Sequence, residues 1–91
     1  MTEVSGKSLI RNKLGMHARA AAVFVLKAQQ FEADIRVCKD DIDVSGKSIM
    51  GILQLAAVQG DEIEIMARGQ DGSSALQALQ GLVADRFGEE E

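Results

Sequence analysis

The chain contains no proline, tryptophan or tyrosine, and it has one cysteine and one histidine among its 91 residues. A single cysteine cannot form an internal disulfide, which fits a reducing compartment. No window approaches the roughly 20 apolar residues that a bilayer span needs, and residues 1–11 lack the basic-then-apolar layout of a secretory signal. We therefore expect a cytoplasmic protein that does not enter a membrane.

Positive charge is also scarce. The chain has 10 Lys and Arg residues and 14 Asp and Glu residues, which gives a net charge of -4. Nucleic acids and anionic membranes both require a basic protein face, so neither is an expected partner. Hydrophobic residues make up 46% of the chain and charged residues 26%, which is typical of a globular protein. The length suits one domain over residues 1–91, in which the charged residues 88–91 form a frayed tail.

Apolar and polar residues alternate in four stretches, which predicts four half-buried strands. The clearest is the stretch 62–68, where Ile63, Ile65 and Ala67 would point inward. The other three are residues 4–12, 33–39 and 42–44, of which the last two form a hairpin. Strands with one solvent-exposed face are typical of an antiparallel sheet. Parallel strands that are covered on both faces instead have continuous apolar sequences.

Three further stretches space their apolar residues as helices do. They begin near Arg19, at Ser48 and near Asp71. The resulting element order is β-α-β-β-α-β-α. It predicts an α+β open-faced sandwich, with a four-stranded antiparallel sheet and all three helices on one face.

The first two helices each carry a second apolar stripe that cannot face the core of a two-layer protein. On the first helix this stripe would leave apolar surface beside His17, which indicates a docking site for partner proteins. Alternatively, the second helix is buried all round, as short apolar helices usually are. The predicted docking residues are Ala18, Ala22, Val23, Leu26, Ile49, Met50 and Leu53.

The single histidine, His17, stands just before the first helix in the stretch LGMHARAA. Amide groups at a helix start lack acceptors within the helix and lie at the positive end of its dipole, so they form an anion site. A neutral imidazole nitrogen can attack a phosphoryl group, whose oxygens these amides would then bind. Arg19 can reach the same oxygens with its planar guanidinium group. The positive surroundings would keep the ring neutral, and neither a metal nor a cofactor is needed.

The sequence resembles the histidine-containing phosphocarrier proteins HPr of the bacterial phosphotransferase system. The resemblance rests on LGMHARAA and GKSIMGILQLAA, in the order and separation of that family, and it covers about residues 4–87. It implies the fold predicted above. It also implies that His17 accepts a phosphoryl group on Nδ1 from enzyme I and passes it to IIA proteins or domains for sugar uptake, assisted by Arg19. Such a carrier is a phosphoryl-transfer intermediate rather than a turnover enzyme, and we expect a monomer.

Two positions in these motifs bear on regulation and rigidity. The resemblance implies that Ser48 is a site for an HPr kinase/phosphorylase, whereas a serine at a helix start can equally be a simple cap. Family members usually have a proline one residue after the arginine, where this chain has Ala20. Proline would stiffen the helix start, so we expect Ala20 to alter rigidity and partner preference while phosphoryl carriage survives.

Two other functions stay open at this point. One is the regulatory or nitrogen branch of the same family (NPr-like), in which the phosphoryl group reaches control proteins instead of sugar permeases. The other is an interaction module in which His17 only caps a helix. Neighbouring genes would separate the two branches. Phosphorylation by enzyme I and phosphoenolpyruvate, with His17→Ala as the control, would separate a carrier from a module.

Overall fold

The computed structural model describes residues 2–91, which contain a sheet of four strands and three helices in the predicted order. The strands are β1 (Glu3–Leu9), β2 (Asp34–Lys39), β3 (Ile42–Ser45) and β4 (Glu62–Arg68). The helices are α1 (Ala18–Ala28), α2 (Ile49–Gln54) and α3 (Gly72–Ala84), and a short 3-10 helix, η1 (Arg86–Gly88), follows α3.

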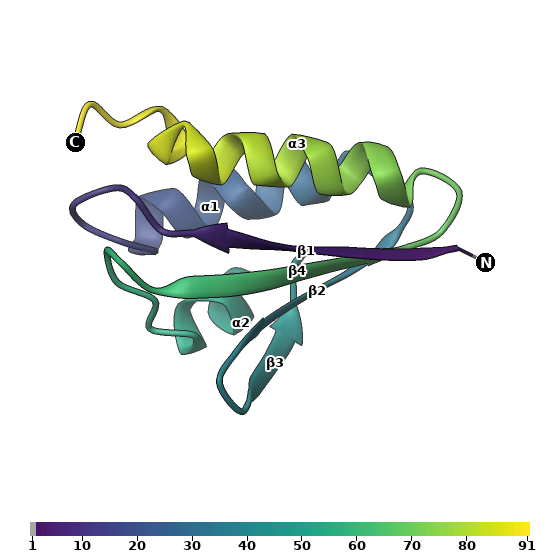
Figure 1. The fold of residues 1–91 in the computed structure, drawn as a ribbon, viewed down its shortest axis with the longest axis horizontal. Helices are drawn as coiled ribbons and strands as arrows, with labels where there is room; N and C mark the ends of the chain where they lie inside the picture. Colours follow the sequence, from purple (N-terminus) through teal and green to yellow (C-terminus); the bar gives the residue numbers. More distant parts are fainter. Residues whose placement is uncertain (1) are drawn as a thin grey trace.

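Neighbouring strands are antiparallel, in the order β1-β4-β2-β3. The central strand β4 pairs with β1 from Glu3 opposite Arg68 to Leu9 opposite Glu62, and with β2 along its other edge. Figure 1 shows this twisted sheet, with α1 and α3 lying side by side along it. Because α1 follows β1 through a loop, the start of α1 lies at one end of the sheet.

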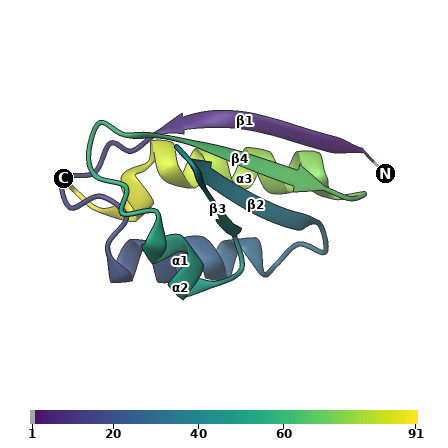
Figure 2. The same cartoon turned by 90° about the horizontal axis from the view of Figure 1, so that it is seen from below.

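One face of the sheet is apolar and buried, and the other is polar and open. Ile35, Val37, Ile63 and Ile65 are at most 1% exposed on the inner face. The alternate positions of the same strands are more exposed, and most of them are polar. The helices cover the inner face (Figure 2). The predicted open-faced sandwich is confirmed.

The helices add their predicted apolar stripes to this core. In α1 the buried stripe consists of Ala21, Phe24, Val25 and Ala28. Leu79 and Val83 of α3 and Ile52 of α2 are fully buried against the sheet and α1. No helix within residues 2–91 has the length and apolarity needed to cross a bilayer.

The first strand is shorter than the sequence predicted, since it ends at Leu9 and not at Asn12. Ile10 still exchanges backbone hydrogen bonds with the turn before β4, but the chain then leaves the sheet. The Asn12 side chain turns inward and donates a hydrogen bond to the carbonyl of Gly15. A loop stabilised by its own side chain therefore replaces the last residues of the predicted strand.

Candidate functional site

The imidazole of His17 caps α1. His17 has an extended backbone (φ -79°, ψ -179°), and its Nδ1 accepts a hydrogen bond from the backbone N–H of Arg19 at 3.3 Å. Its own carbonyl accepts the N–H of Ala21 at 2.8 Å. The ring thus takes the place that a serine or aspartate side chain usually occupies at a helix start. The predicted position of His17 at the start of α1 is confirmed.

The loop before α1 fixes where this cap lies. Met16 is buried, and its N–H donates to the carbonyl of Ala57 at 2.9 Å. Gly15 has φ +70°, and a Cβ there would lie 2.6 Å from the same carbonyl oxygen. Only glycine suits this backbone without strain, because L side chains avoid positive φ and no space is left for one. The glycine lets the loop pack tightly, which places His17 at the edge of the core.

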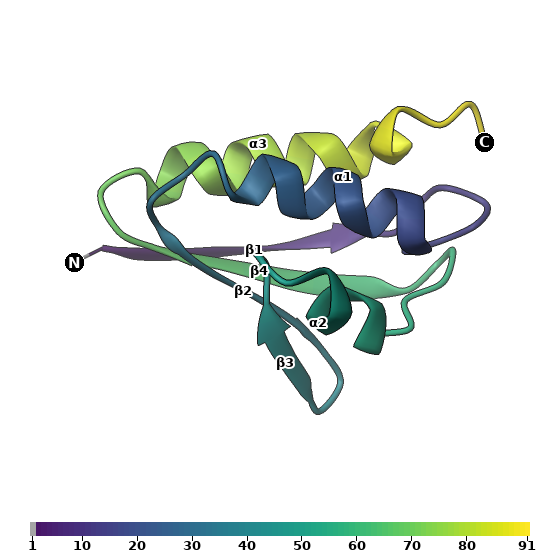
Figure 3. The same ribbon diagram turned by 180° about the vertical axis from the view of Figure 1, so that it is seen from behind.

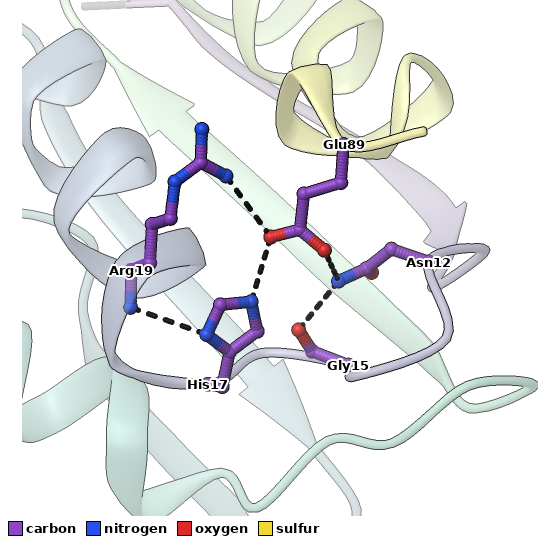
Figure 4. A network of polar contacts seen from close by, with 5 residues as sticks. All are labelled: Asn12, Gly15, His17, Arg19 and Glu89. Carbon is purple, nitrogen blue, oxygen red and sulfur yellow. Dashed lines mark hydrogen bonds and ion pairs between the residues drawn. The ribbon is translucent and has the colours of Figure 1, made fainter. Parts of the chain in front are cut away.

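A carboxylate from the C-terminal tail faces the other ring nitrogen. The Nε2 atom of His17 lies 2.6 Å from Oε2 of Glu89, and Nη1 of Arg19 lies 3.3 Å from the same oxygen. The second carboxylate oxygen, Oε1, accepts a hydrogen bond of 3.0 Å from Nδ2 of Asn12. Figure 4 shows these four side chains converging at the start of α1. The carboxylate joins the C-terminal tail to residues 12–19, which lie at least 70 positions before Glu89 in the sequence.

This network defines the tautomer of the ring. An ionised carboxylate can only accept hydrogen bonds, so Nε2 of His17 must be the donor to Glu89. Nδ1 faces a backbone N–H, which can only donate, so Nδ1 carries the lone pair. The neutral ring therefore presents an unprotonated Nδ1 at the helix start.

Glu89 is ionised in this environment. Burial raises the pKa of its carboxyl group, but hydrogen bonds from Asn12 and His17 and the charge of Arg19 outweigh it, so the pKa is lowered below its ordinary value. The sequence predicted only positive surroundings for the His17 ring. The structure adds this negative partner.

Sequence reasoning did not identify Glu89, because residues 88–91 read as a charged, frayed tail. In the structure Phe87 is 3% exposed and anchors the chain end beside α1. Arg86, Phe87 and Gly88 all have positive φ, and this tight turn directs Glu89 back toward His17. Figure 3 shows the tail beside the start of α1. An apolar Phe87 within an otherwise charged segment was the signal that could have indicated docking of the tail.

Asn12 is a second site residue that sequence reasoning missed. Its side chain is fully buried, and Nδ2 donates both to the Gly15 carbonyl at 2.7 Å and to Glu89. These two acceptors fix the orientation of the amide. Its Oδ1 is buried without a hydrogen-bond partner among the residues described. Asn12 therefore links the loop that carries His17 to the tail that carries Glu89.

The site opens to solvent on one side. The side chain of His17 is 28% exposed and that of Arg19 is 62% exposed. They border a shallow hollow of about 440 Å³, whose lining residues are Lys13, Leu14, His17, Arg19, Glu89, Glu90 and Glu91. No group of three or more His, Cys, Asp or Glu side chains in the described part of the chain is arranged to hold a metal ion.

The second predicted site residue, Ser48, caps α2. Its Oγ accepts the N–H of Gly51 at 3.0 Å. The two helices α1 and α2 lie side by side (Figures 2 and 3).

Among the predicted docking residues, the exposed fractions are 76% for Met50, 64% for Leu26, 43% for Ile49 and 38% for Leu53. Ala18 is also exposed. Ala22 and Val23 are only half-buried, and Val23 packs partly against the core. Leu14, which the sequence did not suggest, is 68% exposed next to the site.

Comparisons with known proteins agree with this architecture. A family model described as "PTS HPr component phosphorylation site" matches residues 4–85. The phosphocarrier protein HPr of Neisseria meningitidis (strain Z2491) is 48% identical over 82 residues, which cover 90% of this chain and 92% of that protein. The phosphocarrier protein NPr of Shewanella violacea is 37% identical over 89 residues, or 98% of each chain.

A solved structure shows the same fold. The crystal structure of HPr-C-His from Thermoanaerobacter tengcongensis matches with a TM-score of 0.88 and 45% sequence identity, covering 100% of both chains. Together with the family match over residues 4–85, this shows that the chain belongs to the HPr family of phosphocarrier proteins of the phosphotransferase system.

Proposed function

We propose that this protein accepts a phosphoryl group from phospho-enzyme I on Nδ1 of His17 and passes it to IIA proteins or domains during sugar uptake. It would do so as a cytoplasmic monomer that presents one face to successive partners. The observation that carries the proposal is the lone pair on Nδ1, held at a helix start in a partly exposed ring. An unprotonated nitrogen is what nucleophilic attack on phosphorus requires.

The helix start supplies the groups that receive the phosphoryl oxygens. The N–H of Arg19 now bonds to Nδ1 and would move its hydrogen bond to an oxygen of the arriving group. The N–H of Ala18, the first residue of α1, has no acceptor within the helix and is available for a second one. Phosphoryl transfer depends mainly on positioning and on charge stabilisation, which fixed amides provide without rearrangement.

Arg19 supplies the mobile positive charge. One of its five N–H donors lies near Glu89, and the side chain is 62% exposed, so the guanidinium group can swing to an incoming anion. The dianionic phosphoryl group attracts it more strongly than a single carboxylate charge does. We therefore assign Arg19 to stabilising the phosphoryl group on His17.

A transfer assay tests the proposal. The protein is incubated with enzyme I and phosphoenolpyruvate beside His17→Ala, and the phosphoryl group bound to each is measured. We expect wild type to gain an acid-labile phosphoryl group that His17→Ala does not gain. Equal incorporation into both would place the group elsewhere. No incorporation into wild type would leave the interaction module as the better description.

The exposed apolar residues of α1 and α2 form the proposed docking face for enzyme I and IIA proteins. Met50 and Leu26 are its most exposed predicted members, at 76% and 64%. A charge there would oppose burial at an interface. Met50→Glu should weaken transfer from enzyme I, while Leu9→Glu, at a 52% exposed position on β1, serves as the matched control. Equal loss in the two variants would contradict this assignment.

Ser48 is proposed as a regulatory phosphorylation site for an HPr kinase/phosphorylase. A dianion at the start of α2 is compatible with the helix, but its charge beside the exposed Ile49 and Met50 would disturb apolar docking. Phosphorylation should therefore lower transfer from enzyme I without unfolding the protein. The kinase reaction on wild type and Ser48→Ala, followed by the transfer assay, checks both parts.

The nitrogen-branch function remains the second candidate, because the NPr of Shewanella violacea matches over 98% of each chain. Its carrier chemistry would be identical and only the acceptor would differ. Phosphoryl donation from the loaded protein to a sugar-specific IIA and to a regulatory IIA-like protein, compared side by side, separates the two branches. A strong preference for the regulatory acceptor would replace sugar uptake by the regulatory function.

A further inference from the structure

Glu89 poses an electrostatic question. A residue that receives a dianionic phosphoryl group would be expected to avoid negative neighbours, yet Glu89 lies 2.6 Å from the His17 ring. The contact is made through Nε2, whereas Nδ1 faces the backbone N–H of Arg19. The two nitrogens point to different sides of the ring, so Glu89 leaves the proposed acceptor atom free.

We propose that Glu89 is a positioning residue that holds the proton of His17 on Nε2 throughout the phosphoryl-transfer cycle. This inference rests on the proposed function, since it concerns phosphoryl acceptance at Nδ1. The carboxylate plays the part that a buried aspartate plays for the histidine of a serine protease, where it fixes the tautomer and stabilises the imidazolium.

The chemistry balances without any exchange of protons by the ring. On acceptance, the Nδ1 lone pair forms a bond to phosphorus while the bond from phosphorus to the donor protein's leaving atom breaks. The ring becomes an N-phosphorylated imidazolium that keeps its proton on Nε2, and the Glu89 carboxylate faces the new positive charge. This charge pairing keeps the proton on Nε2 while the phosphoryl group is bound.

Donation runs the same steps in reverse. The Nδ1–P bond breaks, its electrons return to Nδ1, and the ring leaves as neutral imidazole with the proton still on Nε2. If that proton were absent, the leaving group would be the strongly basic imidazolate anion, which leaves slowly. A carboxylate that keeps Nε2 protonated therefore assists both directions of transfer.

The contacts around Glu89 hold its carboxylate in one position. Its side chain is only 14% exposed, and it is held by Asn12 on one oxygen and by His17 and Arg19 on the other. Asn12 is in turn fixed by the carbonyl of Gly15 in the loop before the ring. The lowered pKa of Glu89 keeps the carboxylate charged at neutral pH. If Arg19 swings to the phosphoryl group, Asn12 still holds the carboxylate.

A merely structural role for the tail makes a different prediction. Glu89→Gln keeps the size of the side chain and an oxygen that can accept from Nε2–H, but it removes the charge. If the tail only packs against the site, this variant should behave as wild type. Glu3→Gln is the matched control, because it removes the same charge from an exposed residue at the start of β1, which does not line the site.

The experiment measures single-turnover transfer from phospho-enzyme I to the protein, and from the loaded protein to an IIA acceptor. We expect Glu89→Gln to be roughly tenfold slower in both directions at saturating donor, as loss of one charge-assisted hydrogen bond implies. The donor concentration that gives half-maximal rate should not change. Glu3→Gln should match wild type in both rates, and circular dichroism should show all variants folded.

A spectroscopic measurement reports the proton directly. In ¹⁵N-labelled wild type and Glu3→Gln, the His17 Nε2–H should give a proton signal that exchanges slowly with water. In Glu89→Gln the exchange should be faster, because the neutral amide holds the proton less tightly.

If wild type and Glu3→Gln take up the phosphoryl group at His17 and Glu89→Gln does so equally fast, the role of Glu89 is refuted while the carrier function stands. If wild type takes up none at His17, the carrier function itself fails, and the role of Glu89 fails with it.

Discussion

The starts of α1 and α2 both leave backbone N–H groups without acceptors in the helix, and a different side chain accepts one of them in each case. Each begins with a side chain that accepts an otherwise unpaired amide: Nδ1 of His17 lies 3.3 Å from the N of Arg19, and Oγ of Ser48 lies 3.0 Å from the N of Gly51. Around His17 the fold adds a carboxylate and a guanidinium group. Around Ser48 it adds the exposed apolar residues Ile49 and Met50.

The difference shows that a cap alone does not make a reactive site. Both caps satisfy a helix dipole and an unpaired N–H. Only the first has a titratable ring whose two nitrogens are assigned by separate partners, one local and one from residue 89. We expect chemistry at the first helix start and recognition or regulation at the second.

The largest expected effect comes from exchanging the first cap for the kind found at the second. His17→Ser keeps a side-chain oxygen that can accept the N–H of Arg19, but it removes the nucleophilic nitrogen. Phosphoryl acceptance should be lost, while the melting temperature changes by only a few degrees. The transfer assay and thermal unfolding check the two parts. If His17→Ser accepted the phosphoryl group at a rate near that of wild type, the assignment of the chemistry to the His17 ring would be contradicted.

Detaching the tail should have the next largest effect. Phe87 is 3% exposed and anchors the turn that delivers Glu89 to the first helix start. Phe87→Ala should lower the free energy of unfolding by about 3 kcal/mol, the low end for a buried phenylalanine. Urea denaturation measures this change in the free energy of unfolding. A loss below about 1 kcal/mol would mean that the tail is weakly anchored in solution.

At the start of α2, two variants of Ser48 separate the effect of its capping hydrogen bond from the effect of a negative charge. Ser48→Ala removes the acceptor for the N–H of Gly51 and should cost about 1 kcal/mol of stability while transfer continues. Ser48→Asp restores an acceptor and adds a negative charge at the helix start, so it should keep stability but slow transfer from enzyme I. Urea denaturation and the transfer assay distinguish the two. The reverse pattern would contradict a regulatory role.

The carboxylate at the first helix start should make stability depend on pH. The pKa of Glu89 is lowered in the folded protein from its ordinary value of 4.5, so its contribution is present above that value and is lost as pH falls through the folded pKa. Wild type should exceed Glu89→Gln by about 1 kcal/mol near neutral pH. In acid below the folded pKa the two should converge. A difference that does not change with pH would show that the charge is not involved.

The smallest effect is expected at Ala20, where the resemblance to the family implies a proline. Ala20 is fully buried and is the third residue of α1, where an amide has no acceptor within the helix. Ala20→Pro removes a donor that the helix does not use, so stability should change by less than about 1 kcal/mol. Altered partner choice with retained transfer would support the predicted effect on rigidity. Unchanged kinetics and partner choice would show that the replacement is neutral.

Local patterns explain why much of the fold could be predicted. The alternation in residues 62–68 matches β4 residue for residue, and the stripe from Ala21 to Ala28 is buried as predicted. The caps His17 and Ser48 lie next to the amides that they accept, so the sequence indicates them directly.

The remaining part of the site depends on contacts that sequence periodicity does not record. Glu89 reaches His17 only because three consecutive residues with positive φ reverse the chain after α3. The strand predicted over residues 4–12 includes Asn12, whereas in the structure its side chain is buried and bonded to the loop. Long-range polar contacts of this kind become visible only when the tertiary structure is known.

The central claim is tested most directly by locating the phosphoryl group on the ring. Protein labelled with ¹⁵N in its single histidine is phosphorylated by enzyme I and phosphoenolpyruvate, and ¹⁵N–³¹P coupling is measured by NMR. We predict a one-bond coupling between phosphorus and Nδ1 of His17, with a proton remaining on Nε2. One-bond coupling to Nε2, or a loaded protein with no coupling to either ring nitrogen, would contradict the account.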